Sequence, residues 1–407
     1  MNPWPKPHIA PLSGLSFPSL KLINSQKVMT TIEPATPFRI YVCGITPYDA
    51  THLGHAATYV AFDLINRYQQ LAGNRLDFVE NITDIDDPLL VRAKRDSIDW
   101  NVLAENQIDL FLTDMAALRV IAPNNLVTVT SSMKIIEDFI TLLDQRGFLY
   151  QIENDHYFSV ESFLEEMPLS TDDAIKIFSE RGGDPKRPGK KHPLDPVVWM
   201  AHQGDDPSWE SKFGLGRPGW HVECTAIAVH YLDSPNADPI IQIQGGGSDL
   251  AFPHHYMSEQ IVRAAYGRGF ANNYVHSAMI YLDGEKMSKS KGNLVFVSKL
   301  LSQGIDPMVI RWALLSGHYQ QDRSWSDELL QKSTSEVSLL RSALAQSEVA
   351  ETKELIQSIV FDLANNLDTP AALRRLIAWA KSSQGSPKVN ESGLVSRGID
   401  SLLGLAL

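Results

Sequence analysis

One stretch of sequence, residues 38–73, does most to limit the folds open to this chain. A short apolar, β-branched run is typical of a strand and ends at Cys43. A polar turn follows, and then a segment whose apolar side chains recur at steps of three and four, as in an amphipathic helix. Ligands of parallel α/β sheets bind at the carboxyl ends of the strands. Cys43, with His52 and His55 at the helix entrance, is therefore expected at a ligand site.

The rest of the chain repeats this alternation of strands and helices. Apolar runs predict further strands, and periodic segments predict helices at 98–150 and from about 305 onward. The predicted fold is α/β, a doubly wound, Rossmann-like parallel-sheet catalytic domain with a C-terminal helical bundle. Further strands are expected at 75–83, 151–160, 239–244 and 274–281. The expected domains are a lead segment 1–37, a catalytic domain 38–304 with an insertion at about 115–200, and a helical domain 305–407.

Composition limits the functional classes. The chain of 407 residues has a net charge of −12, which argues weakly against nucleic acid as a partner. Neither an apolar run of about 18 residues nor a signal-peptide pattern is found, so we expect a cytoplasmic protein without a membrane span. The only two cysteines, Cys43 and Cys224, argue against a secreted disulfide framework.

The two cysteines leave several interpretations open. They lie 181 positions apart, so they give no zinc-finger signal, and each alone is typical of a buried core thiol. Cys43 could also be a nucleophile. Because Cys43, Cys224 and His254 each lie near a predicted strand end or a glycine-rich loop, a doubly wound sheet could bring them together as metal ligands.

Two charged loops also have competing interpretations. The acidic run at 84–87 resembles a metal loop, but it lacks the spacing of a calcium site, so helix capping is the favoured interpretation. The basic run at 186–192 is either a solvated face or a lid over an anionic or polyhydroxylated substrate.

Two short motifs connect the chain to a known family. THLGH (51–55) resembles the HIGH motif of class I aminoacyl-tRNA synthetases, and KMSKS (286–290) is identical to their second signature. The segments around CGITPYDATHLGH, NITDIDD, GRPGWHVEC and GGGSDLAFPHH resemble cysteinyl-tRNA synthetase and its relatives. CGITPYDATHLGH and ERGGDP (180–185) resemble most closely the mycothiol cysteine ligases, which join L-cysteine to glucosaminyl-inositol with ATP.

The resemblance implies a class I synthetase fold and a set of site residues. His52, His55, Lys286 and Lys289 would act on the ATP phosphates, and one Zn²⁺ would be held by Cys43, Cys224 and His254. Mg²⁺ would accompany ATP. The residues that would bind ATP and the adenylate, besides Lys286 and Lys289, are Cys43, Gly44, Ile45, Thr46, Thr58, Asn81, Ile82, Thr83, Trp220, Gly247, Ser248, Asp249 and Ile280.

One departure from the synthetases bears on selectivity. They typically place a glutamate four positions after the first histidine of FPHH as a fourth zinc ligand, and here that position is Ser258. Three ligands leave zinc an open tetrahedral position that a substrate thiolate can fill, whereas a serine hydroxyl is a far poorer ligand. No editing domain would then be needed.

The implied reaction has two steps and AMP as a product. Cysteine is activated as cysteinyl-adenylate with release of pyrophosphate, and the amine of glucosaminyl-inositol then takes the cysteinyl group. The main alternative is a cysteinyl-tRNA synthetase. Only 117 residues follow KMSKS, without a basic or aromatic cluster, so a small acceptor and a monomer without nucleic acid are expected. A catalytically dead nucleotide-binding module is disfavoured because both signatures are intact.

Overall fold

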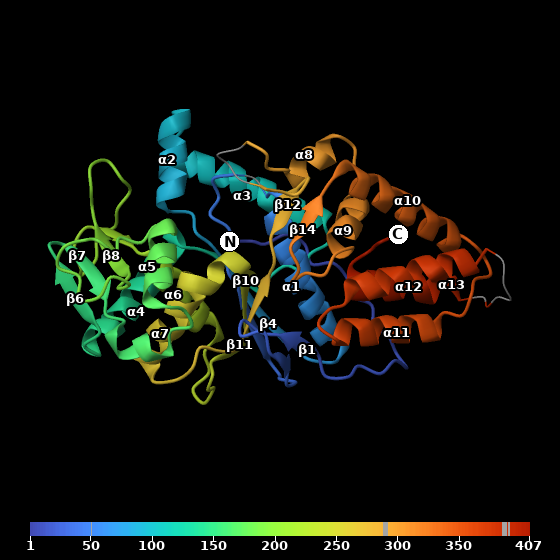
Figure 1. Cartoon of the computed structure of the whole chain (residues 1–407), viewed down its shortest axis with the longest axis horizontal. Helices are drawn as coiled ribbons and strands as arrows, with labels where there is room; N and C mark the ends of the chain where they lie inside the picture. The colour runs from blue at the N-terminus through green and yellow to red at the C-terminus, as the bar shows by residue number, and fades with distance from the viewer. Residues whose placement is uncertain (50, 288–291, 385–388, 390) are drawn as a thin grey trace.

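A five-stranded parallel sheet forms the centre of the molecule (Figure 1). The structure is a computed structural model that describes residues 1–49, 51–287, 292–384, 389 and 391–407. The strand order β11-β10-β3-β4-β5 confirms the predicted doubly wound α/β fold. The strands are β3 (Phe38–Val42), β4 (Leu76–Ile82), β5 (Asn125–Thr128), β10 (Ile241–Gly247) and β11 (Ala271–Ser277).

Strand alternation determines which side chains meet on each face of the sheet. Successive side chains of a strand point to opposite faces. In β3, Phe38, Ile40 and Val42 therefore join one hydrophobic core, whereas Tyr41 and Cys43 join the other. The alternation of side chains along the strand thus places the Cys43 thiol in the same core as Tyr41.

Helices cover both faces of the sheet. The helices packed in the first core include α1 (Leu53–Leu71), α3 (Trp100–Ala117), α9 (Pro307–Leu315) and α13 (Ser392–Leu403). The second core packs α4 (Met133–Gln145), α6 (Trp220–Leu232) and α7 (Tyr256–Tyr266). Cys43 and the helix that carries Cys224 therefore share a face.

A four-stranded antiparallel sheet lies to one side of the central sheet, on the left in Figure 1. Its strands and its neighbouring helix are β6 (Leu149–Ile152), β7 (Asp155–Phe158), β8 (Val197–Ala201), β9 (Gly216–Pro218) and α5 (Thr171–Glu180). The single strand predicted at 151–160 is wrong, because Glu153 takes a left-handed conformation (φ 53°) and turns the chain into a hairpin.

The segment predicted as one strand at 274–281 is also divided. Its first part belongs to β11 of the central sheet, and its second part is β12 of a separate small sheet. Two small sheets comprise β1 (Lys21–Ile23) and β2 (Met29–Thr31), and β12 (Ile280–Leu282), β13 (Glu285–Lys286) and β14 (Arg323–Trp325). The remaining α-helices are α2 (Asp87–Asp96), α8 (Val297–Ser302), α10 (Asp327–Leu344), α11 (Lys353–Ala364) and α12 (Thr369–Ser382). Across the described ranges, helices are too short or too polar to span a membrane.

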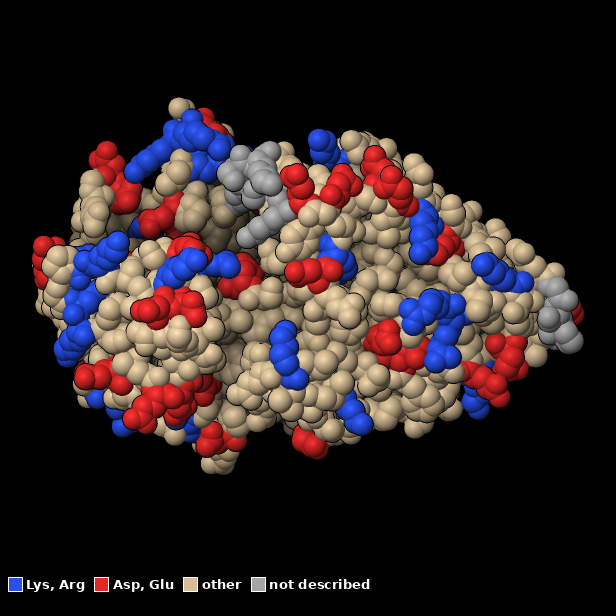
Figure 2. Space-filling model, in the orientation of Figure 1, with Lys and Arg blue, Asp and Glu red and all other residues tan. Residues whose placement is uncertain are grey.

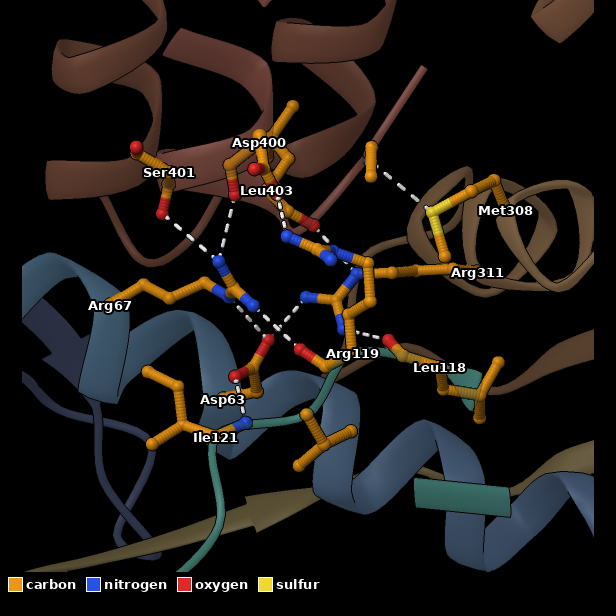
Figure 3. Close-up of polar contacts among 12 residues, drawn as sticks. Asp63, Arg67, Leu118, Arg119, Ile121, Met308, Arg311, Asp400, Ser401 and Leu403 are labelled. Atoms are coloured by element: carbon orange, nitrogen blue, oxygen red, sulfur yellow. Dashed lines mark hydrogen bonds and ion pairs between the residues drawn. The ribbon is translucent and has the colours of Figure 1, made fainter. Parts of the chain in front are cut away.

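Buried ions join α1 to the C-terminal helices (Figure 3). Asp63 on α1 pairs with Arg67 and Arg311, and all three side chains are fully buried. The two guanidinium groups also donate to backbone carbonyls at the end of α13, namely those of Asp400, Ser401 and Leu403. Because helix C-terminal carbonyls carry partial negative charge, they help to neutralise the second arginine.

Candidate active site

A cavity of about 920 Å³ opens at the carboxyl end of the central sheet. Its position agrees with the rule that ligands bind at the carboxyl ends of parallel strands. Thirteen of the site residues expected from the sequence line it: Cys43, Gly44, Ile45, Thr46, His52, His55, Thr58, Thr83, Trp220, Cys224, Gly247, Asp249 and His254.

Cys43, Cys224 and His254 form a buried cluster in the cavity wall. The three potential ligand atoms lie within 4.8 Å of one another. His254 is fully buried and its Nε2 has no hydrogen-bond partner among the described residues, while its Nδ1 lies 3.0 Å from Nδ1 of His221. Two thiols and an unpartnered imidazole nitrogen are a ligand set suited to a soft divalent metal such as zinc. This cluster could therefore bind a metal ion.

The charge state of the two thiols is asymmetric. Burial raises the pKa of the Cys43 thiol well above its usual value. The hydrogen bond from Cys43, together with nearby His254, holds the pKa of Cys224 below its usual value despite burial. The pair therefore favours a thiolate at Cys224, and a thiolate is the form that binds metals.

Helical spacing explains how the cluster is assembled. Cys224 lies four positions after Trp220 and three after His221 on α6, so both side chains are its neighbours on the helix surface. The Trp220 indole stacks on the His254 ring with centroids 4.3 Å apart and an angle of 13°. His221 was not identified from the sequence, although its position three residues before Cys224 is a usable signal.

Two further histidines extend the cluster toward the surface. His255 Nε2 lies 3.3 Å from the Cys43 sulfur, and His255 Nδ1 lies 2.8 Å from Nε2 of His276. A residue that contacts a metal-binding side chain from behind holds that side chain in position. His255 can act in this way on Cys43, and His276 can act on His255. His276 falls in the segment predicted as a strand at 274–281, but only the fold shows that it lies near the end of β11 and contacts His255.

His52 caps α1 with its own side chain. Its Nδ1 accepts hydrogen bonds from the amides of Gly54 at 3.1 Å and His55 at 3.4 Å. The amide of Leu53 donates to Val295 instead. The first helix amides are thus already paired within the protein. With Nδ1 as an acceptor, neutral His52 carries its proton on Nε2, which makes that nitrogen a hydrogen-bond donor.

The segment after the second signature pairs with the first signature. His52 forms a β-bridge with Phe296, and the Val297 amide donates to the carbonyl of Thr51. Lys286 belongs to the two-residue strand β13, which pairs with β12. Lys289 lies outside the described residues. The fold thus brings residues 295–297 next to THLGH across more than 240 positions of sequence.

Close packing around Gly44 fixes the loop after β3. A Cβ on Gly44 would lie 1.5 Å from the backbone oxygen of Asn81, so no larger residue fits. The Asn81 side chain accepts hydrogen bonds from the Gly44 amide and the Tyr41 hydroxyl and donates to Thr83. Asn81 therefore supports the cavity wall from behind.

The other expected site residues lie away from the cavity lining. Ile82 is buried in the first core. Ile280 is buried at the start of β12, and Ser248 is exposed. The acidic run behaves as the capping interpretation predicted, because Asp86 caps α2 and Asp84 accepts a hydrogen bond from the Thr130 amide.

A second wall of the cavity comes from α2 and the antiparallel sheet. Half of its residues belong to NITDIDD, ERGGDP or the basic run, and the other half carried no motif in the sequence. Its position depends on contacts between distant segments. Arg181, from the ERGGDP segment, bridges the cavity rim to Asp249 at 3.2 Å. The members that line the cavity are Asp86, Asp87, Pro88, Asp155, Tyr157, Phe178, Glu180, Arg181, Gly182, Gly183, Asp184, Arg187, Pro196, Val197, Met200 and Gln203.

Comparison with known families assigns most of the chain to a family of tRNA synthetase catalytic domains. Residues 30–335 match the model of the class I (C) tRNA synthetase catalytic domain. Among curated relatives, proteins named L-cysteine:1D-myo-inositol 2-amino-2-deoxy-alpha-D-glucopyranoside ligase from Tsukamurella paurometabola and Streptomyces coelicolor are 46% and 45% identical, each over all of both chains. A protein from Corynebacterium jeikeium named as ligase 2 of this kind is 45% identical over the same extent.

Solved structures with a similar fold are more distant in sequence. Methionyl-tRNA synthetase of Mycobacterium tuberculosis, bound to methionyl-adenylate, has a TM-score of 0.63 at 15% identity and covers 91% of this chain and 92% of its own. A protein described as a putative arginyl-tRNA synthetase of Campylobacter jejuni has a TM-score of 0.59 at 14% identity, with 92% and 93% coverage. These similarities show a class I synthetase fold.

Proposed function

The chain belongs to the class I (C) synthetase family and, within it, to the L-cysteine:1D-myo-inositol 2-amino-2-deoxy-alpha-D-glucopyranoside ligases, and we propose that the cavity at the carboxyl edge of its sheet carries out their reaction. The enzyme is an ATP-dependent ligase. It activates L-cysteine as cysteinyl-adenylate and transfers it to the amine of glucosaminyl-inositol. The single observation that carries the residue-level proposal is the Cys43–Cys224–His254 cluster inside the same cavity as THLGH.

Cysteine selectivity rests on the buried cluster. Cys43, Cys224 and His254 would hold a zinc ion, which when bound would offer a thiophilic coordination position to the substrate thiolate. Ser258, at the position of the fourth synthetase ligand, donates its hydroxyl to the carbonyl of His254 at 3.0 Å. Because the Ser258 hydroxyl already donates to a backbone carbonyl four residues before it, the contact supports a ligand set of three residues.

Activation takes place next to the start of α1. The cysteine carboxylate attacks the α-phosphate of ATP, and pyrophosphate leaves. His52 Nε2–H and the neighbouring His55 would donate to phosphate oxygens, with Lys286 and Lys289 stabilising the charge on the leaving pyrophosphate and Mg²⁺ accompanying ATP. Positioning and electrostatics provide most of the catalysis in this type of reaction, and His52 is held in place by its two backbone contacts.

Transfer follows in the same cavity. The free amine attacks the activated carbonyl carbon, an amide bond forms, and AMP leaves as the carbon–oxygen bond to phosphate breaks. The loop from Gly44 to Thr46 and the Trp220 indole line the cavity beside the cysteine-binding cluster and would hold the adenylate in place. Preorganised loops of this kind reduce the entropy lost when two reactants are brought together.

The setting of the enzyme follows from the same residues. We expect a cytoplasmic protein, because both cysteines would have to stay reduced to bind the metal and both are free thiols in the structure. We also expect it to be a monomer. Acidic and basic side chains are interspersed over the face seen in Figure 2, which supports a small-molecule acceptor in place of nucleic acid.

A two-stage assay tests this function. Purified protein is first assayed for ATP–pyrophosphate exchange that depends on cysteine, with serine as the control amino acid. Glucosaminyl-inositol or tRNA is then added, and the product is identified by mass. We expect exchange with cysteine and a cysteinyl amide of the sugar; exchange with no transfer to the sugar, or transfer only to tRNA, would contradict the proposal.

A further inference from the structure

The cavity has a second chemical side that the adenylate residues leave unused. Its volume of about 920 Å³ is near the upper end of the range for a single small-molecule site, roughly 300–1,000 Å³. The signature residues line the edge of the parallel sheet, whereas the opposite wall comes from α2 and from residues 155–203. A second reactant therefore has a surface of its own.

Two anchored groups of side chains form the middle of this wall. In the first, Asp155 is buried, accepts the Ala201 amide at 2.7 Å and pairs with Arg187 at 2.5 Å. Arg187 also reaches Glu153 at 3.2 Å. The guanidinium plane is thereby held against strand β7, so that an incoming hydroxyl meets a fixed donor.

The second group is centred on Asp184 of the ERGGDP segment. One carboxylate oxygen accepts the Tyr157 hydroxyl at 2.5 Å, and the other accepts Nζ of Lys190 at 2.8 Å. The Lys190 side chain is only 3% exposed and lies over the rings of Tyr157 and Phe178. A buried lysine thus fixes the Asp184 carboxylate from behind while Asp184 lines the cavity.

The charges on the wall fit a cationic, polyhydroxylated molecule. Five carboxylates and two guanidinium groups line this side of the cavity: Asp86, Asp87, Asp155, Glu180, Asp184, Arg181 and Arg187. Carboxylates accept hydrogen bonds from sugar hydroxyls and attract an ammonium group, and guanidinium groups donate to hydroxyls.

We propose that the wall formed by Asp155, Tyr157, Asp184 and Arg187 binds the hydroxyls of the amino-sugar acceptor and sets its affinity. This inference rests on the proposed function, because it assigns the acceptor of that reaction to a particular surface. Within the basic loop at 186–192, only some residues would then bind the acceptor. Arg187 lines the cavity, whereas the neighbouring Lys186 is exposed and does not line it.

Two neighbouring residues provide a matched experiment. Arg187→Met removes the guanidinium donors, and Lys186→Met makes the same replacement one position away. Both variants and the wild type are compared in cysteine-dependent ATP–pyrophosphate exchange and in transfer to glucosaminyl-inositol at varied acceptor concentration. We expect Arg187→Met to raise the KM for the acceptor at least tenfold with exchange within about twofold of wild type, as for loss of a hydrogen bond to a charged group. Lys186→Met should match wild type in both.

A double variant covers the case in which Arg187→Met misfolds because Asp155 is left unpaired. Asp155→Asn with Arg187→Met removes both charges, and the side-chain amide oxygen introduced at position 155 can still accept the Ala201 amide. An acceptor KM equal to that of Lys186→Met in a folded variant, or an equal loss of exchange and transfer, would overturn the wall assignment. Failure of the wild type to transfer cysteine to the sugar would instead overturn the proposed function.

Discussion

At the scale of single residues, the candidate metal cluster depends on where three side chains point. Cys43 reaches the cluster because it continues the side of β3 that carries Tyr41, and Cys224 reaches it from α6. His254 presents a buried nitrogen without a partner among the described residues. A buried polar atom without a hydrogen bond costs about 1–3 kcal/mol of folding free energy, so a metal bound to this nitrogen would remove that cost.

Replacement of one thiol should remove the metal. We expect Cys224→Ser to lower zinc content from about one ion per chain to near zero and to abolish cysteine-dependent exchange, because a hydroxyl is a poor zinc ligand. Elemental analysis of the purified protein measures the first effect. Ser258→Ala is the matched control: among the residues described, the Ser258 hydroxyl bonds only to the His254 carbonyl, so zinc content should be unchanged. A Cys224→Ser protein with full zinc would refute the ligand assignment.

One buried acid makes stability depend on pH near neutrality. Burial raises the pKa of Asp114, on α3, to about 7, against the opposing influence of Thr51 and the Ser298 amide. The folded state then binds the proton more tightly than the unfolded state. The stabilisation is full below the unfolded pKa of about 3.9 and is lost as the pH rises through about 7.

The matching measurement is chemical unfolding at pH 5.5 and pH 8. Relative to Asp114→Asn, the wild type should lose on the order of 2 kcal/mol of unfolding free energy across this interval. Asp109→Asn, on the exposed side of the same helix, should follow the wild type. Parallel curves for wild type and Asp114→Asn would mean that Asp114 does not titrate in this range.

At the scale of elements, the buried ions of Figure 3 determine how α1, α9 and α13 pack. Burial alone would raise the pKa of Asp63, but Arg67 and Arg311 together hold it below its usual value. Gly404 ends α13 at φ 68°, and a Cβ there would lie 2.4 Å from the Arg311 guanidinium. The helix end, the glycine and the ion pair therefore form a single packed unit.

Loss of the central carboxylate should be costly. We expect Asp63→Asn to lower the free energy of unfolding by about 3–5 kcal/mol, since two buried guanidinium groups lose their counter-ion. Asp362→Asn, which breaks a partly exposed pair with Arg375, should cost about 1 kcal/mol or less. Denaturant unfolding compares the two.

The same variant gives a pH signature with the opposite sign to that of Asp114. Because the folded pKa of Asp63 is depressed, its stabilisation is present above about 3.9 and is lost as the pH falls through the folded value. The gap in stability between wild type and Asp63→Asn should therefore narrow in acid. A gap that stays constant down to about pH 2 would contradict the assignment.

At the scale of the whole molecule, the C-terminal helices are part of the first core. Val395, Ile399 and Leu402 of α13 are fully buried in the core that also holds Phe38 and Ile40 of the central sheet. We expect a chain that ends at Glu391 to lose cooperative unfolding and exchange activity, because Arg67 and Arg311 would lose their carbonyl partners on α13. Circular dichroism and tryptophan fluorescence during heating measure this; a truncated chain with a single sharp transition and normal exchange would contradict it.

The sequence by itself determined the alternation of strands and helices, the parallel α/β class and the signature motifs, since these depend on local periodicity and on residue types at short spacing. It also identified Cys43, Cys224 and His254 as possible partners, but left core thiol, nucleophile and ligand open. Only the tertiary structure decided that these three atoms share one cavity wall, that His221 and His255 stand behind them, and that Arg187 faces the cavity while Lys186 does not. Those facts depend on packing between segments far apart in the chain, which no local pattern encodes.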